Sequence, residues 1–464
     1  MNYYFLGIGG IGMSAIARFF KLNGHTVSGY DRTASPLTRR LESEGIPIHY
    51  DDDPSQIPSD IDLVVYTPAV PTDTREFVAL QQRGVEMKKR SQVLGELTRG
   101  KKCVAVAGSH GKTTTSAMIA YILSKSDMGC SAFLGGIAKN FDSNLVVNPE
   151  SEFIVVEADE YDRSFLQLHP FYSVITSADP DHLDIYGTHE KLLEAFSQFA
   201  NQTSPDGALI IKEGLCGHHH DHEHHEEHHE EEHHTLKIGE EIKCLTYSSN
   251  SIEPDYYAIN LRNYKGNIFF DLRTPKGVLY DIELRNSCLY NVENAVAASA
   301  VALECGVGEY QLRFALKTFA GIRRRFDVRV NNKDIVYIDD YAHHPREIAA
   351  TINSVRYLYP DKRVVGIFQP HLYSRTRDLA DQFAEVLDTL DETVLIPLYP
   401  AREKPIPGVS SGMILRKMKS MNKYLCSPEQ VPDLAEALCP DVLLTMGAGD
   451  IDRLVPVIEE RFSE

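Results

Sequence analysis

The chain has 464 residues with a formal net charge of −19, and 43% of its residues are hydrophobic. This length favours about three domains, at roughly 150 residues per domain. Residues 218–234 hold seven carboxylates and no Lys or Arg, so the rest of the chain carries −12, which makes nucleic acid an unfavourable general partner.

The first unit alternates strands with a helix. The pattern predicts strands and a helix, in chain order, over residues 3–8, 11–24, 25–31 and 61–70. Such alternation is typical of a parallel, doubly wound sheet, here a Rossmann-like domain. Residues 91–102 are interpreted as the exit from this unit, and the domain is expected to span residues 1–99.

A glycine-rich turn, G-x-G-G-x-G at residues 7–12, joins the first strand to the helix. Its glycines allow a pyrophosphate to approach the backbone, and Asp31 closes the next strand as in dinucleotide sites. NAD and a UDP-sugar both fit this pattern, and a tight turn without a ligand is the structural alternative.

The second unit opens with CVAVAGSHGKTTT at residues 103–115. The loop resembles the phosphate-binding pattern G-x-x-x-x-G-K-[ST], but its first glycine is two residues closer to the lysine. A strand, a short loop and a helix beginning near Lys112 would direct backbone N–H groups at a phosphate, with Lys112 on the β/γ-phosphates and Thr113 on Mg²⁺. A glycine turn with an N-capping Thr is the alternative.

Two acidic segments follow apolar strands of this unit, EADEYDRSF at 157–165 and SADPDHLDIYG at 177–187. Both are expected at the carboxyl edge of the sheet, near the loop at 108–113. Glu157 and His182 could hold Mg²⁺ beside Thr113, since hard oxygen ligands and water suit that ion and one imidazole is unusual but tolerable. A solvated acidic loop is the alternative.

The remainder of the second unit contains an unusual insertion. Ten His and seven acidic residues alternate over residues 217–234, which predicts a solvated loop or weak capture of Zn²⁺, Ni²⁺ or Cu²⁺. Alternating segments at 243–249, 255–266 and 267–274 predict antiparallel strands, and a helix is expected at 291–306. This central P-loop ATPase-like α/β domain is expected to span residues 100–319.

A third, Rossmann-like α/β unit is expected over residues 320–464, after a basic linker at 319–329. Its strands end in polar or glycine-rich residues, where parallel sheets bind ligands. His343, His371, Arg375 and Arg377 follow two of these strands and could bind a carboxylate or a phosphate. Ordinary surface charge is the alternative for any single Arg.

The eight Cys are scattered and form no C-x-x-C pattern, so neither a zinc ribbon nor a thioredoxin motif is predicted. No signal peptide and no apolar stretch of about 18 residues is recognisable. A cytoplasmic protein without a membrane partner is therefore expected, as a monomer or a homodimer.

In this order, the motifs resemble those of the Mur ligases across nearly the whole chain. The segments that carry the resemblance are GIGGIGMSAIA, GSHGKTTT, EADEYDRSF, DPDHLDIYG, NVENAVAA, GIRRRFD, DDYAHHP, FQPHLYSRTRD and MGAGDID. The shortened loop G-x-x-G-K-T is the form found in that family. The resemblance implies three α/β domains and ATP-dependent joining of L-alanine to UDP-N-acetylmuramate through an acyl phosphate, in peptidoglycan precursor synthesis.

Residue roles are implied by the same resemblance. The residues implied to be catalytic are Lys112, Glu157, His182 and His343. ATP contacts are implied at Gly108, Ser109, His110, Gly111, Lys112, Thr113, Thr114, Asn291, Arg324 and Asp340. The UDP-substrate would lie against Gly7, Gly9, Gly10, Ile11, Gly12, Asp31 and Thr67. Mg²⁺, or Mn²⁺, would be held by Thr113, Glu157 and His182, and the amino acid would meet Tyr341, His343, His371 and Arg375.

The sequence also departs from the family pattern. Leu372 stands where Arg is usual, and Tyr290 replaces a frequent His before Asn291. Ser197 and Gln198 occupy the region where several relatives carry a carbamylated lysine, so none is predicted. Three alternative functions remain open: a recycling ligase that attaches a tripeptide, an NAD-dependent dehydrogenase, and a metal-storage protein built around the His-rich tract.

Overall fold

The structure, a computed structural model, describes residues 1–180, 183–216, 235–401 and 403–463. The chain divides into two compact units. The first unit is Met1–Ile259 with Asp271–Tyr280 and Glu293–Leu316, and the second is Asn260–Phe270 with Asp281–Val292 and Lys317–Glu464. The predicted metal ligand His182 and the His-rich tract lie outside the described residues.

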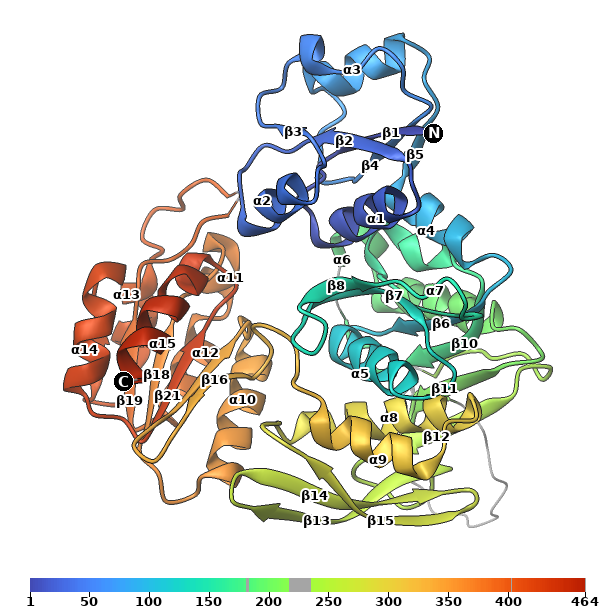
Figure 1. The fold of residues 1–464 in the computed structure, drawn as a ribbon. Coiled ribbons are helices and arrows are strands. Elements are labelled where there is room, and N and C mark those ends of the chain that lie inside the picture. Colours follow the sequence, from blue (N-terminus) through green and yellow to red (C-terminus); the bar gives the residue numbers. More distant parts are fainter. Residues whose placement is uncertain (181–182, 217–234, 402, 464) are drawn as a thin grey trace. The chain divides into compact units, whose positions relative to one another are not determined.

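The first unit begins with a five-stranded parallel sheet of order β3-β2-β1-β4-β5 (Figure 1). Its strands are β1 (Asn2–Leu6), β2 (Thr26–Tyr30), β3 (Ile48–His49), β4 (Leu63–Tyr66) and β5 (Met87–Lys89). Its helices are α1 (Ile11–Leu22), α2 (Pro36–Ser43), α3 (Arg75–Gln82) and α4 (Arg90–Thr98), with a 3₁₀ turn at Pro54–Gln56. The predicted doubly wound sheet is confirmed, and the segment interpreted as an exit is largely the helix α4.

The central sheet has ten strands in the order β15-β14-β13-β12-β11-β10-β6-β9-β7-β8. Its first part contains β6 (Lys102–Ala107), β7 (Ser131–Ala138), β8 (Ser143–Val146), β9 (Phe153–Glu157), β10 (Pro170–Ile175) and β11 (Ala208–Lys212). The helices are α5 (Lys112–Ser124), α6 (Leu183–Tyr186), α7 (His189–Asn201), α8 (Tyr290–Glu304) and α9 (Glu309–Thr318), with a 3₁₀ segment at Tyr161–Gln167. Because β9 and β10 flank β6, both acidic segments leave the sheet beside the loop after β6, as predicted.

The strands after residue 240 are β12 (Cys244–Ser248), β13 (Tyr256–Tyr264), β14 (Asn267–Thr274) and β15 (Gly277–Leu284). Two-residue connections between neighbours make β13, β14 and β15 antiparallel, as expected. The prediction is wrong for β12, which pairs in parallel with both β11 and β13. Alternation along a strand reports which side chains are buried and not the direction of its neighbours, so the sequence could not decide this point.

The second unit contains a six-stranded sheet of order β16-β17-β21-β18-β19-β20. The strands are β16 (Asp327–Asn331), β17 (Val336–Asp340), β18 (Val364–Phe368), β19 (Glu392–Leu395), β20 (Lys423–Leu425) and β21 (Val442–Met446). The helices are α10 (Pro345–Leu358), α11 (Tyr373–Asp378), α12 (Ala380–Leu387), α13 (Ser411–Lys417), α14 (Val431–Ala437) and α15 (Val455–Ser463), with 3₁₀ turns at Pro428–Gln430 and Asp450–Leu454. β16 is antiparallel to β17, so part of the predicted linker is an edge strand, whereas the other pairings are parallel.

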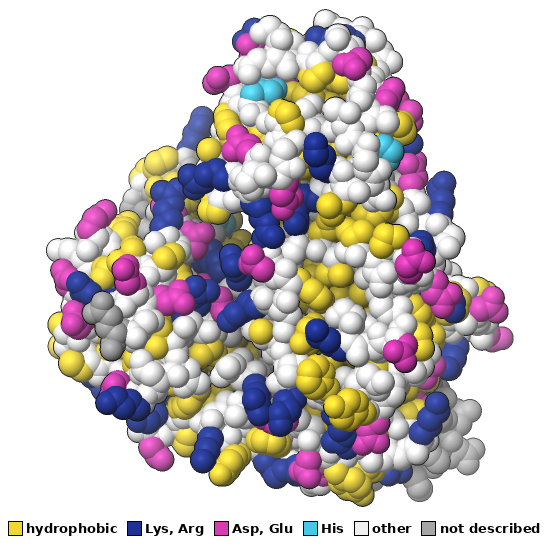
Figure 2. Space-filling model, in the orientation of Figure 1, with side chains coloured by type: hydrophobic (Ala, Val, Ile, Leu, Met, Phe, Trp, Pro, Cys, Tyr) yellow, Lys and Arg dark blue, Asp and Glu magenta, His cyan; other side chains and the backbone are white. Residues whose placement is uncertain are grey.

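The central strands of these sheets are buried on both faces. Residues 103–107 of β6 and 442–446 of β21 are fully enclosed, as expected for parallel strands covered by helices. On the face in Figure 2, Lys and Arg side chains are interspersed with Asp and Glu. Within the described residues, no helix combines the length and the apolar character that a membrane span requires.

Candidate active site

The loop after β6 is closely packed around its two glycines. Gly108 and Gly111 have φ angles of 135° and 82°, in the region that favours glycine. A Cβ on Gly108 would lie 2.1 Å from Oγ1 of Thr176, and one on Gly111 would lie 2.7 Å from Oδ1 of Asn294. The spacing of the two glycines in the sequence therefore follows from backbone conformation and from contacts with β10 and α8.

The segment that follows β10 holds this loop by hydrogen bonds. The Ser109 hydroxyl donates to the carbonyl of Asp179 at 2.8 Å, and the backbone N–H of His110 donates to the hydroxyl of Ser177 at 2.9 Å. The second predicted acidic segment thus holds the loop through its backbone and its serine. Beyond the loop, α5 begins at Lys112, so the loop N–H groups and the helix N-terminus face the same region.

Lys112 is held by a carboxylate that the sequence reasoning did not assign. Its Nζ lies 2.9 Å from both carboxylate oxygens of Glu160 and donates to the carbonyl of Gly108. The Glu160 side chain is only 1% exposed. Glu160 is the second glutamate of E-A-D-E, three residues after Glu157, and this repeated acid is the signal that could have revealed it.

Glu157 ends β9 and is fixed by a glycine of the neighbouring strand. The backbone N–H of Gly135 in β7 donates to Oε2 of Glu157 at 3.1 Å. A Cβ on Gly135 would lie 2.1 Å from that oxygen, so only glycine leaves the carboxylate in place. Glu157 is paired with Val106 of β6, close to the start of the loop. Gly135 was not predicted, because it lies in a strand without a recognisable motif.

The donors located for a cation are the carboxylate of Glu157 and the hydroxyl of Thr113, the second residue of α5. Hard oxygen donors of this kind fit Mg²⁺, which commonly keeps water and substrate phosphates as its other ligands. Among the described residues, no group of three or more His, Cys, Asp or Glu side chains suited to a metal ion is found.

The glycine-rich turn of the first domain is organised by Asp31. The N–H of Gly9 donates to Oδ2 of Asp31 at 2.8 Å, and a Cβ on Gly9 would lie 2.8 Å from that oxygen. Gly7 has φ 82°, and a Cβ there would lie 2.8 Å from the methyl group of Thr67. The predicted residues Asp31 and Thr67 thus both contact the turn, and Asp31 supports its backbone directly.

Arg90 lies beside the end of this turn. A Cβ on Gly12 would lie 3.0 Å from an NH1 atom of Arg90, and the other guanidinium nitrogen of Arg90 lies 3.3 Å from Asp159. One cation thereby joins the glycine turn to the segment that contains Glu157 and Glu160. The sequence reasoning missed Arg90, although a run of basic residues at 88–90 was a visible signal.

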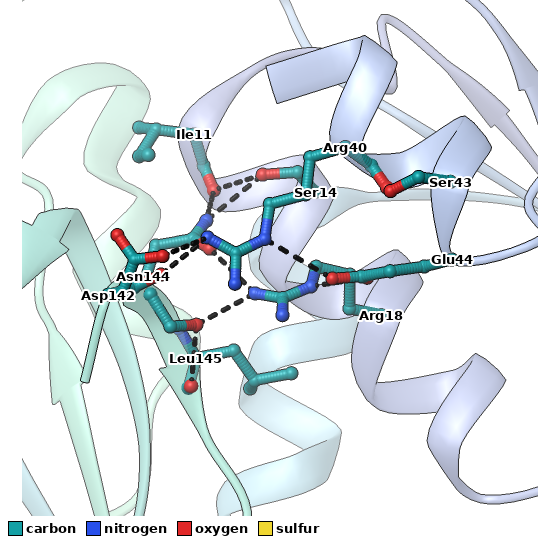
Figure 3. A network of polar contacts seen from close by, with 10 residues as sticks. Ile11, Ser14, Arg18, Arg40, Ser43, Glu44, Asp142, Asn144 and Leu145 are labelled. Atoms are coloured by element: carbon teal, nitrogen blue, oxygen red, sulfur yellow. Dashed lines mark hydrogen bonds and ion pairs between the residues drawn. The ribbon is translucent and has the colours of Figure 1, made fainter. Parts of the chain in front are cut away.

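A buried polar network joins α1 to the β7–β8 hairpin, as Figure 3 shows. The side-chain amide of Asn144 donates to the carbonyl of Ile11 at 2.6 Å and to the hydroxyl of Ser14 at 3.0 Å. Arg18 donates to Oγ of Ser143 at 2.7 Å and pairs with Glu44 at the same distance. The hairpin that carries Gly135 is therefore anchored to the helix that begins at the glycine-rich turn.

In the second unit, the residues predicted to bind the amino acid lie in the loop after β17, in the loop before α11 and in α11 itself. The rings of Tyr341 and His343 are 5.2 Å apart between centroids, and those of His343 and His371 are 6.2 Å apart. Within the described part of the chain, Nδ1 of His371 and an NH1 atom of Arg375 are buried without a hydrogen-bond partner. Such atoms are suited to a polar ligand, since burial without a partner is costly.

Both imidazoles of this cluster are held neutral. Burial, followed by the charge of Arg375, lowers the pKa of His371 to about 4. Burial also lowers the pKa of His343, against the opposing effect of Glu347. A cluster of neutral imidazoles beside an Arg can accept a carboxylate on the guanidinium and a proton on an imidazole nitrogen.

Three predicted nucleotide-side residues also belong to the second unit. Asp340 is buried, accepts a hydrogen bond from Thr351 at 2.6 Å and receives the hydroxyl of Tyr290 at 3.3 Å. Arg324 donates to the carbonyl of Gly447 at 2.6 Å. The amide of Asn291 donates to Ser287 at 3.1 Å. Tyr290, which departs from the family pattern, is thus a hydrogen-bond donor to the carboxylate of Asp340. Leu372, the other departure, has φ 70° and donates its N–H to Tyr399.

The neutral His371 predicts a pH dependence of stability. The folded state keeps this imidazole neutral to about pH 4, whereas the unfolded chain binds a proton near pH 6.5. Proton binding therefore favours unfolding between about pH 6.5 and 4, and its contribution is absent above that range. In urea unfolding at several pH values, we expect the stability of the wild type to fall more steeply in this window than that of His371→Gln. Parallel curves would contradict the assignment of a lowered pKa.

Sequence profiles of one family match most of the chain. They are "Mur ligase family, catalytic domain" at residues 2–102, "Mur ligase middle domain" at 106–302 and "Mur ligase, glutamate ligase domain" at 324–451. The chain belongs to the Mur ligase family. The resemblance derived from the motifs is thus confirmed, as is the three-domain α/β architecture.

Relatives of this Mur ligase share nearly its full length. The UDP-N-acetylmuramate–L-alanine ligase of Parabacteroides distasonis is 48% identical over 463 residues, covering 98% of this chain and 96% of the relative. The enzyme of the same name from Porphyromonas gingivalis strain W83 is 46% identical, with 98% of each chain covered.

Solved structures of other ligases share the fold of this chain. The UDP-N-acetylmuramate–alanine ligase of Thermotoga maritima matches with a TM-score of 0.82 at 28% identity, over 100% of this chain and 99% of that one. A murein peptide ligase from Psychrobacter arcticus matches with a TM-score of 0.67 at 21% identity, over 100% and 99% of the two chains. At that lower identity the similarity concerns the fold alone.

Proposed function

We propose that this Mur ligase joins L-alanine to UDP-N-acetylmuramate with ATP, through an acyl-phosphate intermediate, in peptidoglycan precursor synthesis in the cytoplasm. The observation that carries the proposal is the strand–loop–helix at 103–124, in which two tightly packed glycines present backbone N–H groups beside Lys112. Similarity over the full chain to relatives that bear the name of this activity supports it.

Each domain has a proposed task. Residues 1–99 bind UDP-N-acetylmuramate at the turn of Gly7 to Gly12, residues 100–319 bind ATP, and residues 320–464 bind the amino acid. The proposed protein is a monomer or a homodimer.

In the first step, the lactyl carboxylate of UDP-N-acetylmuramate attacks the γ-phosphorus of ATP, forming an acyl phosphate and releasing ADP. Two anions must approach one another, so the Lys112 ammonium and the N-terminus of α5 offset the charge on the phosphates. Thr113, Glu157 and His182 would hold Mg²⁺, which would supply further positive charge at the same phosphates. Glu160 positions Lys112, and Gly135 positions Glu157.

In the second step, the neutral amine of L-alanine attacks the activated carbonyl, and phosphate leaves. Arg375 binds the carboxylate of the amino acid through its guanidinium. His343 takes the proton that the amine releases, which requires an imidazole that is neutral beforehand. The lowered pKa of His343 meets that requirement.

The proposal predicts oxygen transfer from substrate to phosphate. With ¹⁸O in the lactyl carboxylate, we expect one labelled oxygen in the phosphate released with ATP and L-alanine, because the carboxylate oxygen attacks phosphorus and leaves with it. Mass spectrometry of the phosphate checks this. Label retained entirely in the product would exclude the acyl phosphate.

Matched reactions separate the alternatives. Phosphate release with tripeptide but not with L-alanine would indicate the recycling ligase. A dehydrogenase would bind a nicotinamide cofactor in fluorescence titration, and the loop at 108–113 would then have no ligand in the reaction. Loss of ligation on deletion of residues 217–234 would favour a metal-dependent role for the His-rich tract, whereas we expect ligation to survive.

A further inference from the structure

Two cysteine thiols, one after the end of β11 and one at the start of β12, face one another. Cys216 follows β11, Cys244 opens β12, and their sulfur atoms lie 3.8 Å apart although the residues are 28 positions apart in sequence. Both side chains are half-buried. This contact was not anticipated from the sequence, in which the eight Cys form no recognisable pairs.

The backbone around both thiols is held by hydrogen bonding. Cys244 is paired with Leu209 in the parallel β11–β12 ladder. Cys216 forms a bridge with Leu236, whose N–H donates to the carbonyl of Leu215 at 2.8 Å. Forming a disulfide requires the sulfurs to approach from 3.8 Å to roughly 2.05 Å.

The two thiols interact directly. The hydrogen bond with Cys216, followed by burial, raises the pKa of the Cys244 thiol. Since the thiolate is the nucleophile, the cysteine of the pair that first loses its proton attacks, and the other serves as the resolving thiol.

We propose that Cys216 and Cys244 form a reversible disulfide by exchange with a low-molecular-weight disulfide such as oxidised glutathione. The thiolate of one cysteine attacks one sulfur of the small disulfide and displaces a small thiolate. The other cysteine then loses its proton to solvent and attacks the sulfur of the first, displacing the second small thiolate. The protein pair loses two electrons, which reduce the small disulfide to two thiols.

The disulfide would close a covalent loop from residue 216 to residue 244. Closing a loop of this length restricts the unfolded chain more than the folded one, in which the two ends already meet. Oxidation is therefore expected to raise the melting temperature reversibly. In a reducing cytosol the bond would be transient, which suits a response to oxidation of the thiol pool.

Other cysteines of the chain provide controls. Cys439 is exposed, and its thiol donates to the backbone carbonyl of Glu436. Among the described residues no other thiol lies in contact with it, so exchange should stop there at the mixed disulfide with glutathione. Four further cysteines are buried and should not react, namely Cys103, Cys130, Cys288 and Cys305.

The test uses the full-length reduced protein, incubated with oxidised glutathione, blocked with iodoacetamide, denatured and digested for mass spectrometry. We expect a peptide pair linked between Cys216 and Cys244 and lighter by two hydrogens. Cys216→Ser and Cys244→Ser should each lose this pair, and each should retain glutathione on the remaining cysteine of the pair. Cys439→Ser should keep the link, and dithiothreitol should remove it.

Melting temperature gives a second readout. The oxidised wild type should melt above its reduced form, and neither serine variant of the pair should show that rise. Mixed disulfides with glutathione on both cysteines of the wild type, or unreacted Cys216 while Cys439 is fully modified, would overturn the proposal. These outcomes do not depend on whether the chain joins L-alanine to its nucleotide substrate.

Discussion

Replacing Lys112 with Met is expected to lower kcat for ligation by about 10³-fold, the scale associated with removing one key charge-stabilising donor. Lys112 begins α5 directly after the loop, and its ammonium donates to the carbonyl of Gly108 in that loop. Met retains most of the side-chain volume and removes the charge. Steady-state phosphate release with ATP, UDP-N-acetylmuramate and L-alanine measures the effect.

Lys112 is also paired with a buried carboxylate, so a control must separate loss of stability from loss of catalysis. Lys112→Met leaves the buried carboxylate of Glu160 without its cation, and an unpaired buried charge costs about 3–5 kcal/mol. The double variant Lys112→Met with Glu160→Gln removes both charges and is expected to recover stability but not activity. Lys125→Met, at the other end of α5, should retain activity. Undiminished turnover in a folded Lys112→Met protein would defeat the ATP-site assignment.

Gly135→Ala is expected to weaken the apparent Mg²⁺ affinity by about 10- to 100-fold, the range seen when a residue that orients a metal ligand is changed. The new Cβ would lie 2.1 Å from Oε2 of Glu157 and 2.5 Å from its Cδ, so the carboxylate must move. Titration of Mg²⁺ at fixed ATP, with phosphate release as the signal, measures the shift.

A second measurement separates this positioning role from a general loss of structure. The KM for UDP-N-acetylmuramate should stay near that of the wild type, because the glycine turn at 7–12 does not include Gly135. Gly412→Ala in α13 is the matched control, since its Cβ would meet no atom closer than 3.5 Å. Equal losses of Mg²⁺ affinity and of UDP-substrate affinity would show that Gly135 acts only on the fold.

Short-range sequence patterns were sufficient to predict much of the fold. The run 103–107, a glycine loop and Lys112 at a helix start predicted β6, the loop and α5, and the structure has them there. Strand and helix periods are local properties, so alternating units indicated doubly wound sheets. The family was recognised for the same reason, because its motifs are short and contiguous. The residue roles and domain limits stay predictions.

By itself, the sequence determined which local segments carry chemistry, since residue type and spacing fix backbone conformation and available groups. Tertiary structure alone decided which groups meet. The pattern marks Glu160 only as one acid among several, whereas the segment after β9 places it against Lys112. Gly135 has no signal in the sequence, and β7 places it against Glu157. The parallel direction of β12 and the contact of Cys216 with Cys244 were equally hidden. The reason is physical: sheet pairing and side-chain packing join residues far apart in the chain, and no local pattern records their partners.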